Sequence, residues 1–128
     1  RTCPFEEICP DDYIKTNGEF SVDTYRDESI LVIVSDGELI VLTGCGHHGV
    51  INICSYASKV FGLPVKAFIG GTHLLAFGPE RTDKTLEAIK NSSIRTFAVG
   101  HCTGPDAMRK FESLPSFVPL HTGTVLNL

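Results

Sequence analysis

Apolar and polar positions along the chain form short blocks that predict strands and helices in turn. Residues 30–34 and 39–43 are two continuous runs rich in β-branched and other apolar side chains. Between them lies the pair Asp36-Gly37, which favours a tight turn between antiparallel strands. The pattern therefore predicts a β-hairpin over residues 30–43.

Three later stretches have apolar residues at helical spacing, and shorter apolar runs separate them. The predicted helices cover 50–61, 79–91 and about 105–114, and the predicted strands cover 65–69, 94–99, 117–120 and 124–126. The order of elements is therefore β-β-α-β-α-β-α-β-β, which is typical of an α/β fold. Strands joined through helices pair in parallel, so every strand-to-helix loop should lie at the same edge of the sheet.

The first 24 residues show no such periodicity and contain Pro4, Pro10 and the turn pair Asn17-Gly18. We interpret residues 1–24 as a connecting segment or arm and residues 25–128 as the folded domain. The chain begins with Arg1 and its single methionine is Met108, so we expect it to be a processed or excised piece.

The composition and charge of the chain limit the classes of partner that it can be expected to bind. The chain has 128 residues, 42% of them hydrophobic and 20% charged, with a net charge of −4, which suits one globular domain. Because Lys and Arg form no cluster, we expect no nucleic acid or membrane as a partner and favour a small molecule. No apolar run is long enough to span a bilayer and the first residues do not resemble a signal peptide, so the expected location is the cytoplasm.

Three histidines lie beside glycines in the predicted strand-to-helix loops: His47, His73 and His101. If these loops share one edge of the sheet, their imidazoles can converge although they are far apart in sequence. Neutral imidazoles with an open coordination position form metal sites that activate water or polarise a phosphoryl oxygen. The alternative is that each histidine only caps or hydrogen-bonds its loop.

Neighbouring residues add weaker candidates. His48 adjoins His47 and should point away from it, either supporting the site, facing a substrate or lying exposed. Cys45 and Cys102 flank the same loops, where a thiolate could act as a nucleophile beside an imidazole base, or each could simply be a small buried side chain. The five cysteines include no Cys-x-x-Cys pair, and we expect them to be mostly reduced thiols. For His121 a structural role is favoured.

Several motifs resemble the C-terminal half of metallo-β-lactamase-fold proteins, in the dihydropterin/ribofuranosylaminobenzene-phosphate synthase-like branch. They are Asp27-Glu28-Ser29, Val41 to Asn52 with its Thr-Gly-Cys-Gly-His-His-Gly core, Ile69-Gly-Gly-Thr-His73-Leu, Lys84-Thr85 and Gly100-His-Cys-Thr-Gly104. The resemblance implies half of an αββα sandwich with one or two divalent metal ions. Zinc is the favoured ion, and iron or manganese are the alternatives.

The same resemblance implies roles for individual residues. His47 and His101 would be metal ligands, and His73 would be a third ligand at a position where the wider superfamily often has a bridging aspartate. We also take His73 and His48 as candidate catalytic residues. The implied chemistry is that of a metal-dependent hydrolase or a phosphate-displacing transferase acting on a small molecule, whether phosphorylated or not.

The sequence departs from that family in one respect. The family's His-x-His-x-Asp-His motif belongs to the N-terminal half of the domain, and this sequence contains no His-x-His. The chain would then act as a metallohydrolase when the missing half is supplied, and we expect it to pair with an N-terminal half or with itself. The alternative is a non-catalytic binding or assembly module with a degenerate metal site.

Overall fold

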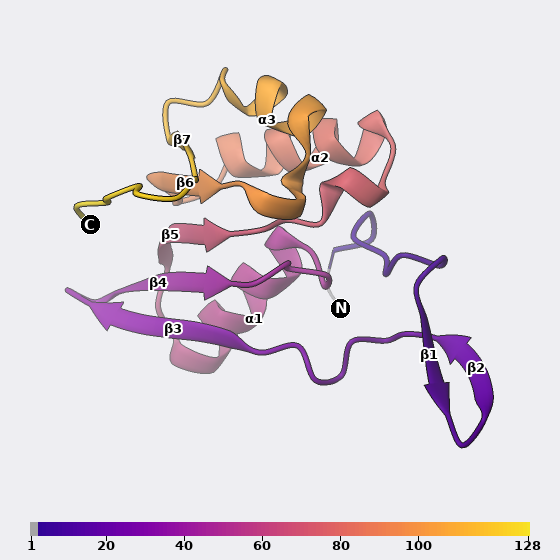
Figure 1. Cartoon of the computed structure of the whole chain (residues 1–128). Helices are drawn as coiled ribbons and strands as arrows, with labels where there is room; N and C mark the ends of the chain where they lie inside the picture. Colours follow the sequence, from indigo (N-terminus) through magenta and orange to yellow (C-terminus); the bar gives the residue numbers. More distant parts are fainter. Residues whose placement is uncertain (1–2) are drawn as a thin grey trace.

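The computed structural model describes residues 3–128 and consists of one mixed sheet, three α-helices and a separate small hairpin (Figure 1). The strands are β1 (Tyr13–Thr16), β2 (Glu19–Val22), β3 (Ile30–Ser35), β4 (Glu38–Thr43), β5 (Val65–Gly70), β6 (Thr96–Val99) and β7 (Phe117–Pro119). The helices are α1 (Val50–Phe61), α2 (Pro79–Lys90) and α3 (Pro105–Phe111), with short 3₁₀ turns η1 (Leu74–Ala76) and η2 (His101–Thr103). This arrangement confirms the predicted α/β fold.

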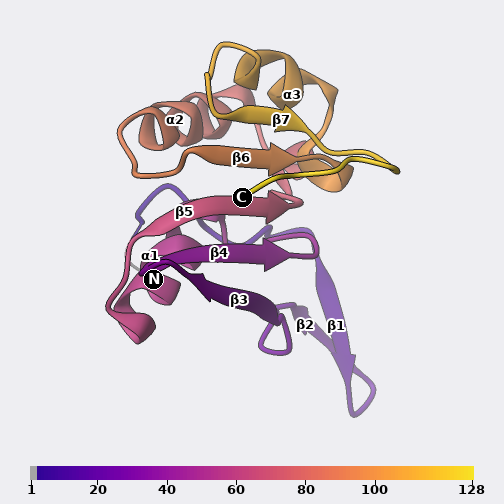
Figure 2. The same cartoon turned by 90° about the vertical axis from the view of Figure 1, so that its left-hand side faces the viewer.

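The main sheet has the strand order β3-β4-β5-β6-β7, so each strand lies beside the next one in sequence (Figure 2). β3 and β4 are antiparallel, and the pairings β4 with β5, β5 with β6, and β6 with β7 are parallel. The predicted hairpin is confirmed, with Asp36 and Gly37 both at positive φ (54° and 77°). Positive φ at both central residues is what a two-residue turn of type I′ requires.

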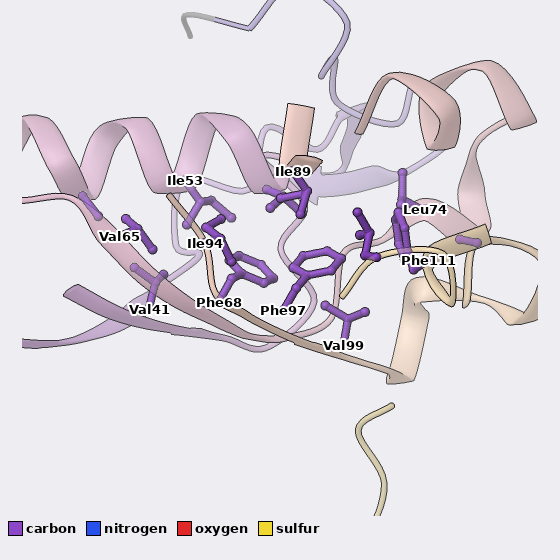
Figure 3. Packing of buried hydrophobic residues seen from close by; sticks show 14 of the residues in the cluster. Val41, Ile53, Val65, Phe68, Leu74, Ile89, Ile94, Phe97, Val99 and Phe111 are labelled. Atoms are coloured by element: carbon purple, nitrogen blue, oxygen red, sulfur yellow. The ribbon is translucent and has the colours of Figure 1, made fainter. Parts of the chain in front are cut away.

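The hydrophobic core lies between the helices and one face of this sheet (Figure 3). Phe68 and Phe97 face each other from neighbouring strands with ring centroids 5.8 Å apart, and Phe111 of α3 meets Phe97 edge-on at 5.1 Å. Ile53 of α1 and Ile89 of α2 join the same cluster. Because the three helices contribute to one cluster, they cover one face of the sheet and fix the strands that carry the histidine loops.

The structure corrects the prediction of a C-terminal strand at residues 124–126. Residues 124–126 form no strand: the last backbone hydrogen bond of the tail to β6 is that of the Leu120 N–H to the Val99 carbonyl (2.9 Å), and Val125 is 83% exposed. β7 itself has three residues and ends at Pro119, which lacks the N–H needed to continue a ladder. The apolar residues of this tail therefore do not determine a strand on their own.

The predicted arm, residues 1–24, contains the hairpin of β1 and β2, which projects away from the main sheet in both views (Figures 1 and 2). Residues 1 and 2 of this segment lie outside the described residues. Within residues 3–128, none of the helices combines the length and the apolar character needed to cross a membrane.

Residues before this hairpin bind the N-terminus of α1. The Glu6 carboxylate is 1% exposed and accepts the N–H groups of Ile51 (2.9 Å) and Asn52 (2.7 Å). Burial raises the pKa of Glu6, although these N–H groups act in the opposite direction. Gly49 leaves room for the carboxylate, because a Cβ there would lie 2.4 Å from Cδ of Glu6. A distant acidic side chain therefore satisfies the first free amides of the helix.

We predict that Glu6→Ala lowers the free energy of unfolding by about 2 kcal/mol, because two buried N–H groups lose their acceptor. Urea denaturation followed by circular dichroism measures this change. Glu7→Ala is the matched control, since the Glu7 side chain is exposed and its backbone carbonyl, which the substitution keeps, accepts the hydrogen bond from Arg81. Equal stability of both variants would contradict this role of Glu6.

Candidate functional site

Three loops meet at the edge of the sheet where β4, β5 and β6 end. The N–H of Gly71 donates to the carbonyl of Gly44 (2.8 Å), and that of Gly100 donates to the carbonyl of Gly70 (3.2 Å). A Cβ on Gly46 would lie 2.6 Å from the Gly71 carbonyl oxygen. Glycine is therefore required here, both for positive φ at Gly46 and for the close approach of the loops.

Glu28 holds the first histidine loop. Its Oε1 accepts the backbone N–H of His47 (2.7 Å) and contacts Nδ1 of the same residue (2.7 Å), and its Oε2 accepts the N–H of His48 (3.1 Å). Burial alone would raise the pKa of Glu28, but these hydrogen bonds outweigh it and hold the pKa below its usual value. The ionised carboxylate therefore keeps the proton of His47 on Nδ1 and leaves Nε2 with a free lone pair.

His47 and His73 lie together beside Tyr25. The ring of His47 stacks on Tyr25 with centroids 3.9 Å apart and planes 7° apart, and its centroid lies 4.4 Å from that of His73. The Tyr25 hydroxyl donates to Asp12, and this hydrogen bond is the main cause that lowers the pKa of the Asp12 carboxyl. Asp12 from the predicted arm and Tyr25, the residue directly after that arm, thus form one wall around two of the predicted metal ligands.

The environment of His73 fits that of a metal ligand. Its Nε2 lies 3.4 Å from Oδ2 of Asp12, but both ring nitrogens are buried without a partner in hydrogen-bonding geometry among residues 3–128. Burial lowers the pKa of His73, and the neighbouring His47 acts in the same direction. A neutral imidazole with buried, unsatisfied nitrogens is the form that binds a transition metal. The side-chain set therefore fits the metal that the family resemblance implies.

His101 lies with sulfur rather than with the other two predicted ligands. Its Nε2 is 3.3 Å from Sγ of Cys45, and Cys102 completes a group whose ligand atoms all lie within 4.8 Å of one another. Burial raises the pKa of the Cys102 thiol, which opposes the alternative of a free thiolate nucleophile at this residue. The structure thus places His101 in a second group at the same edge.

His48 turns away from both groups. Its Nε2 and the backbone carbonyl of Tyr25 lie 3.0 Å apart, so the imidazole donates a hydrogen bond to that carbonyl. The residue also lines a cavity of about 420 Å³ beside α1, together with Tyr56 and Lys59 among others. His121 is exposed in a turn, where its N–H bonds Oγ1 of Thr124. The catalytic roles of His48 and His73 stay predictions.

Sequence patterns missed the side chains that support the site. Asp12 comes from the segment without periodicity, Tyr25 directly follows that segment, and no signal in the sequence points to either residue. Glu28 belongs to the Asp27-Glu28-Ser29 motif of the resemblance, so the sequence marked this residue just before the predicted hairpin. The sequence did not predict that its carboxylate binds the histidine loop. These residues act through contacts that only the folded chain creates.

Comparison with known proteins gives related chains of greater length. No family model matches this chain. Over 117 residues it is 35% identical to a 7,8-dihydropterin-6-methyl-4-(beta-D-ribofuranosyl)-aminobenzene-5'-phosphate synthase of Methanocaldococcus jannaschii, covering 89% of this chain and 40% of the relative. An uncharacterized protein of the same organism is 28% identical over 112 residues, covering 88% of this chain and 41% of that protein. The chain thus spans about two fifths of these curated relatives.

A solved structure shows the same fold. It is the crystal structure of a metal-dependent hydrolase of the β-lactamase superfamily, which superposes with a TM-score of 0.83 at 30% identity. The match covers 91% of this chain and 46% of that one. Sequence and fold together confirm the predicted relationship: the chain has a metallo-β-lactamase-type fold and resembles members of that superfamily.

Proposed function

We propose that this chain supplies part of the active site of a metal-dependent enzyme of the metallo-β-lactamase superfamily, acting as a hydrolase or a phosphate-displacing transferase on a small, phosphorylated molecule. The observation that carries the proposal is His73, whose two ring nitrogens are buried beside the ring of His47, with the Asp12 carboxylate 3.4 Å from Nε2 but outside hydrogen-bonding geometry. The solved neighbour is a metal-dependent hydrolase, and the curated relative is a synthase named for a product that carries a 5'-phosphate. Both similarities support the proposed chemistry.

In this proposal His47 and His73 would hold the metal ion, for which zinc is the favoured identity. His101 would bind the same ion or lie next to it. When bound, such an ion lowers the pKa of water or polarises a phosphoryl oxygen. The chain's own residues supply orientation. Glu28 and the stacked Tyr25 fix the His47 ring with Nε2 free, and Asp12 lies at the Nε2 side of His73. Rigid support of this kind raises metal affinity.

We further propose that the sheet face opposite the helices is covered by the remaining part of such a protein. The strand register aligns one apolar residue from each strand of the sheet on that face: Leu31, Leu42, Ile69, Ala98 and Val118. None of them belongs to the core cluster under the helices; Ala98 is already fully buried, whereas Leu31 is 59% exposed. An apolar row on a sheet face is stabilised when a second sheet packs on it.

A second candidate function is a non-catalytic binding or assembly module. The absence of the His-x-His-x-Asp-His motif from these 128 residues favours it. Assays with generic phosphoesters, with and without added zinc or manganese, separate the two functions. Metal-dependent turnover by the isolated chain would exclude the module; turnover only after the other half is added would support the enzyme.

We predict that His73→Ala lowers the affinity for zinc at least about tenfold, because the substitution removes a neutral imidazole whose ring nitrogens are buried. Isothermal titration calorimetry on metal-free protein measures the change. His121→Ala is the control, since that histidine is exposed in a distant turn and should leave the affinity unchanged. Unaltered zinc binding by the His73 variant would remove this residue from the site.

We predict that Glu28→Gln weakens zinc binding by about 10- to 100-fold, which is typical when the partner of a ligating histidine is lost. The new amide presents one nitrogen to N–H donors, so the His47 ring loses its fixed orientation. The same titration measures the effect, with Asp27→Asn as the matched control. If both variants bind zinc like the parent chain, Glu28 has no positioning role.

We predict that Leu31→Lys abolishes association through the outer sheet face, because a charge replaces the most exposed member of the apolar row. Sedimentation velocity of the chain, alone and mixed with a separately expressed N-terminal half of a relative, measures association. Val60→Lys is the control, since Val60 is 58% exposed on α1 and lies away from this face. Equal association of both variants with the parent chain would place the contact elsewhere.

A further inference from the structure

A cavity of about 420 Å³ lies between α1 and the edge strand β3, and we refer to it as the α1–β3 cavity. Helix α1 packs mainly on β4 and β5, so β3 extends beyond the helix and the space between them is open. The lining includes side chains from both elements and from the segment before β3: Glu28, Ile30, Asn52, Ile53, Tyr56 and Lys59. The volume is in the range of sites that bind small molecules.

The α1–β3 cavity lies on the helix side of the sheet. Ile30 lines it and packs against the core cluster under the helices, whereas the next residue, Leu31, belongs to the apolar row on the opposite face. Successive residues of a strand point to opposite faces of a sheet. A second sheet that packs on the apolar row would therefore lie on the other side of β3 from this cavity.

The wall formed by α1 presents an aromatic ring. Asn52, Tyr56 and Lys59 follow one another at spacings of four and three residues, so they share one face of the helix. Tyr56 is 66% exposed, and its ring makes no aromatic contact or hydrogen bond with any residue in the range 3–128. With Ile30 and Ile53 beside it, this ring provides an apolar surface on which a flat molecule can stack.

The charges that line the cavity differ in whether they are already paired. Glu28 is negative, but its two carboxylate oxygens accept the N–H groups of His47 and His48. The ammonium group of Lys59 forms no ion pair within residues 3–128, and the residue lies about 10 Å from Asn52 along the helix axis. An anionic group in the cavity is therefore attracted to Lys59 and repelled by Glu28.

We propose that the α1–β3 cavity is a site for a small molecule that combines an aromatic ring with one anionic group. The ring would stack on Tyr56 between Ile30 and Ile53, and the anionic group would lie beside Lys59. Neither His47 nor His73 lines the cavity, so this inference does not rest on the proposed enzymatic activity. Binding here can be present or absent whatever the metal chemistry of the chain.

Titration with anilinonaphthalenesulfonate tests the site, because this probe has aromatic rings and one sulfonate and fluoresces in apolar surroundings. We expect saturable binding to the parent chain. Lys59→Glu should weaken it at least about fivefold, since it replaces attraction with repulsion at an exposed charge. Lys90→Glu is the matched control, because Lys90 also lies in the last turn of its helix but outside the cavity. Affinities that are equal in these two variants would overturn the role of Lys59.

An uncharged probe and an aromatic variant complete the comparison. Phenylnaphthylamine has the same rings without the sulfonate, so its affinity should be the same for the parent chain and Lys59→Glu. This result would also show that the variant keeps the cavity. Tyr56→Ala should weaken binding of both probes, whereas Tyr13→Ala, which removes a ring that is 61% exposed on the β1–β2 hairpin, should not. Equal affinities of the two tyrosine variants would overturn stacking on Tyr56.

A measurement on the unaltered chain shows where the probe binds. Nuclear magnetic resonance spectra of nitrogen-15-labelled protein report the amide of each residue during the titration with anilinonaphthalenesulfonate. The largest shifts are expected at Ile30, Ser55 and Lys59, and the smallest at Leu42 and Ile69 on the opposite face of the sheet. Shifts that are largest on that opposite face, or the absence of saturable binding, would overturn the proposed site.

Discussion

The candidate site depends on one constraint, which is the close packing of three loop backbones at the carboxyl edge of the parallel strands. A side chain on Gly46 or Gly71 would collide with the neighbouring loop or with Cys102. Since the loops bond to each other through glycine amides and carbonyls, the histidines and cysteines they carry are held at fixed separations. The chemistry of the edge therefore follows from backbone proximity before any side-chain contact is considered.

Carboxylates from the N-terminal part of the chain complete this arrangement. Glu6 accepts the amides at the start of α1, and Glu28 accepts the amides of His47 and His48 just before that helix. Consecutive free amides at a loop and helix start attract negative charge. The chain thus uses its own acidic side chains at a position where other proteins can bind anions, and it leaves the imidazoles for another ligand.

The sheet is covered by helices on one face only. Its core is continuous from α1 to α3 through Phe68, Phe97 and Phe111, so the described chain has a well-packed interior of its own. The opposite face carries an aligned apolar row across the sheet. This asymmetry is consistent with a chain that matches less than half of its structural neighbour's length.

The sequence by itself determined the elements whose cause is local. The Asp36-Gly37 turn, the helical spacing of α1 and α2, and the run of strands that places His47, His73 and His101 in loops at one edge were all predictable, because periodicity and turn chemistry act over a few residues. Tertiary structure decided the rest. It separated His101 from the His47–His73 pair, joined it to Cys45 and Cys102, and brought Asp12, Tyr25 and Glu28 to the histidines. These contacts join residues far apart in the chain, so their partners depend on how the loops and the arm pack in three dimensions rather than on any local pattern.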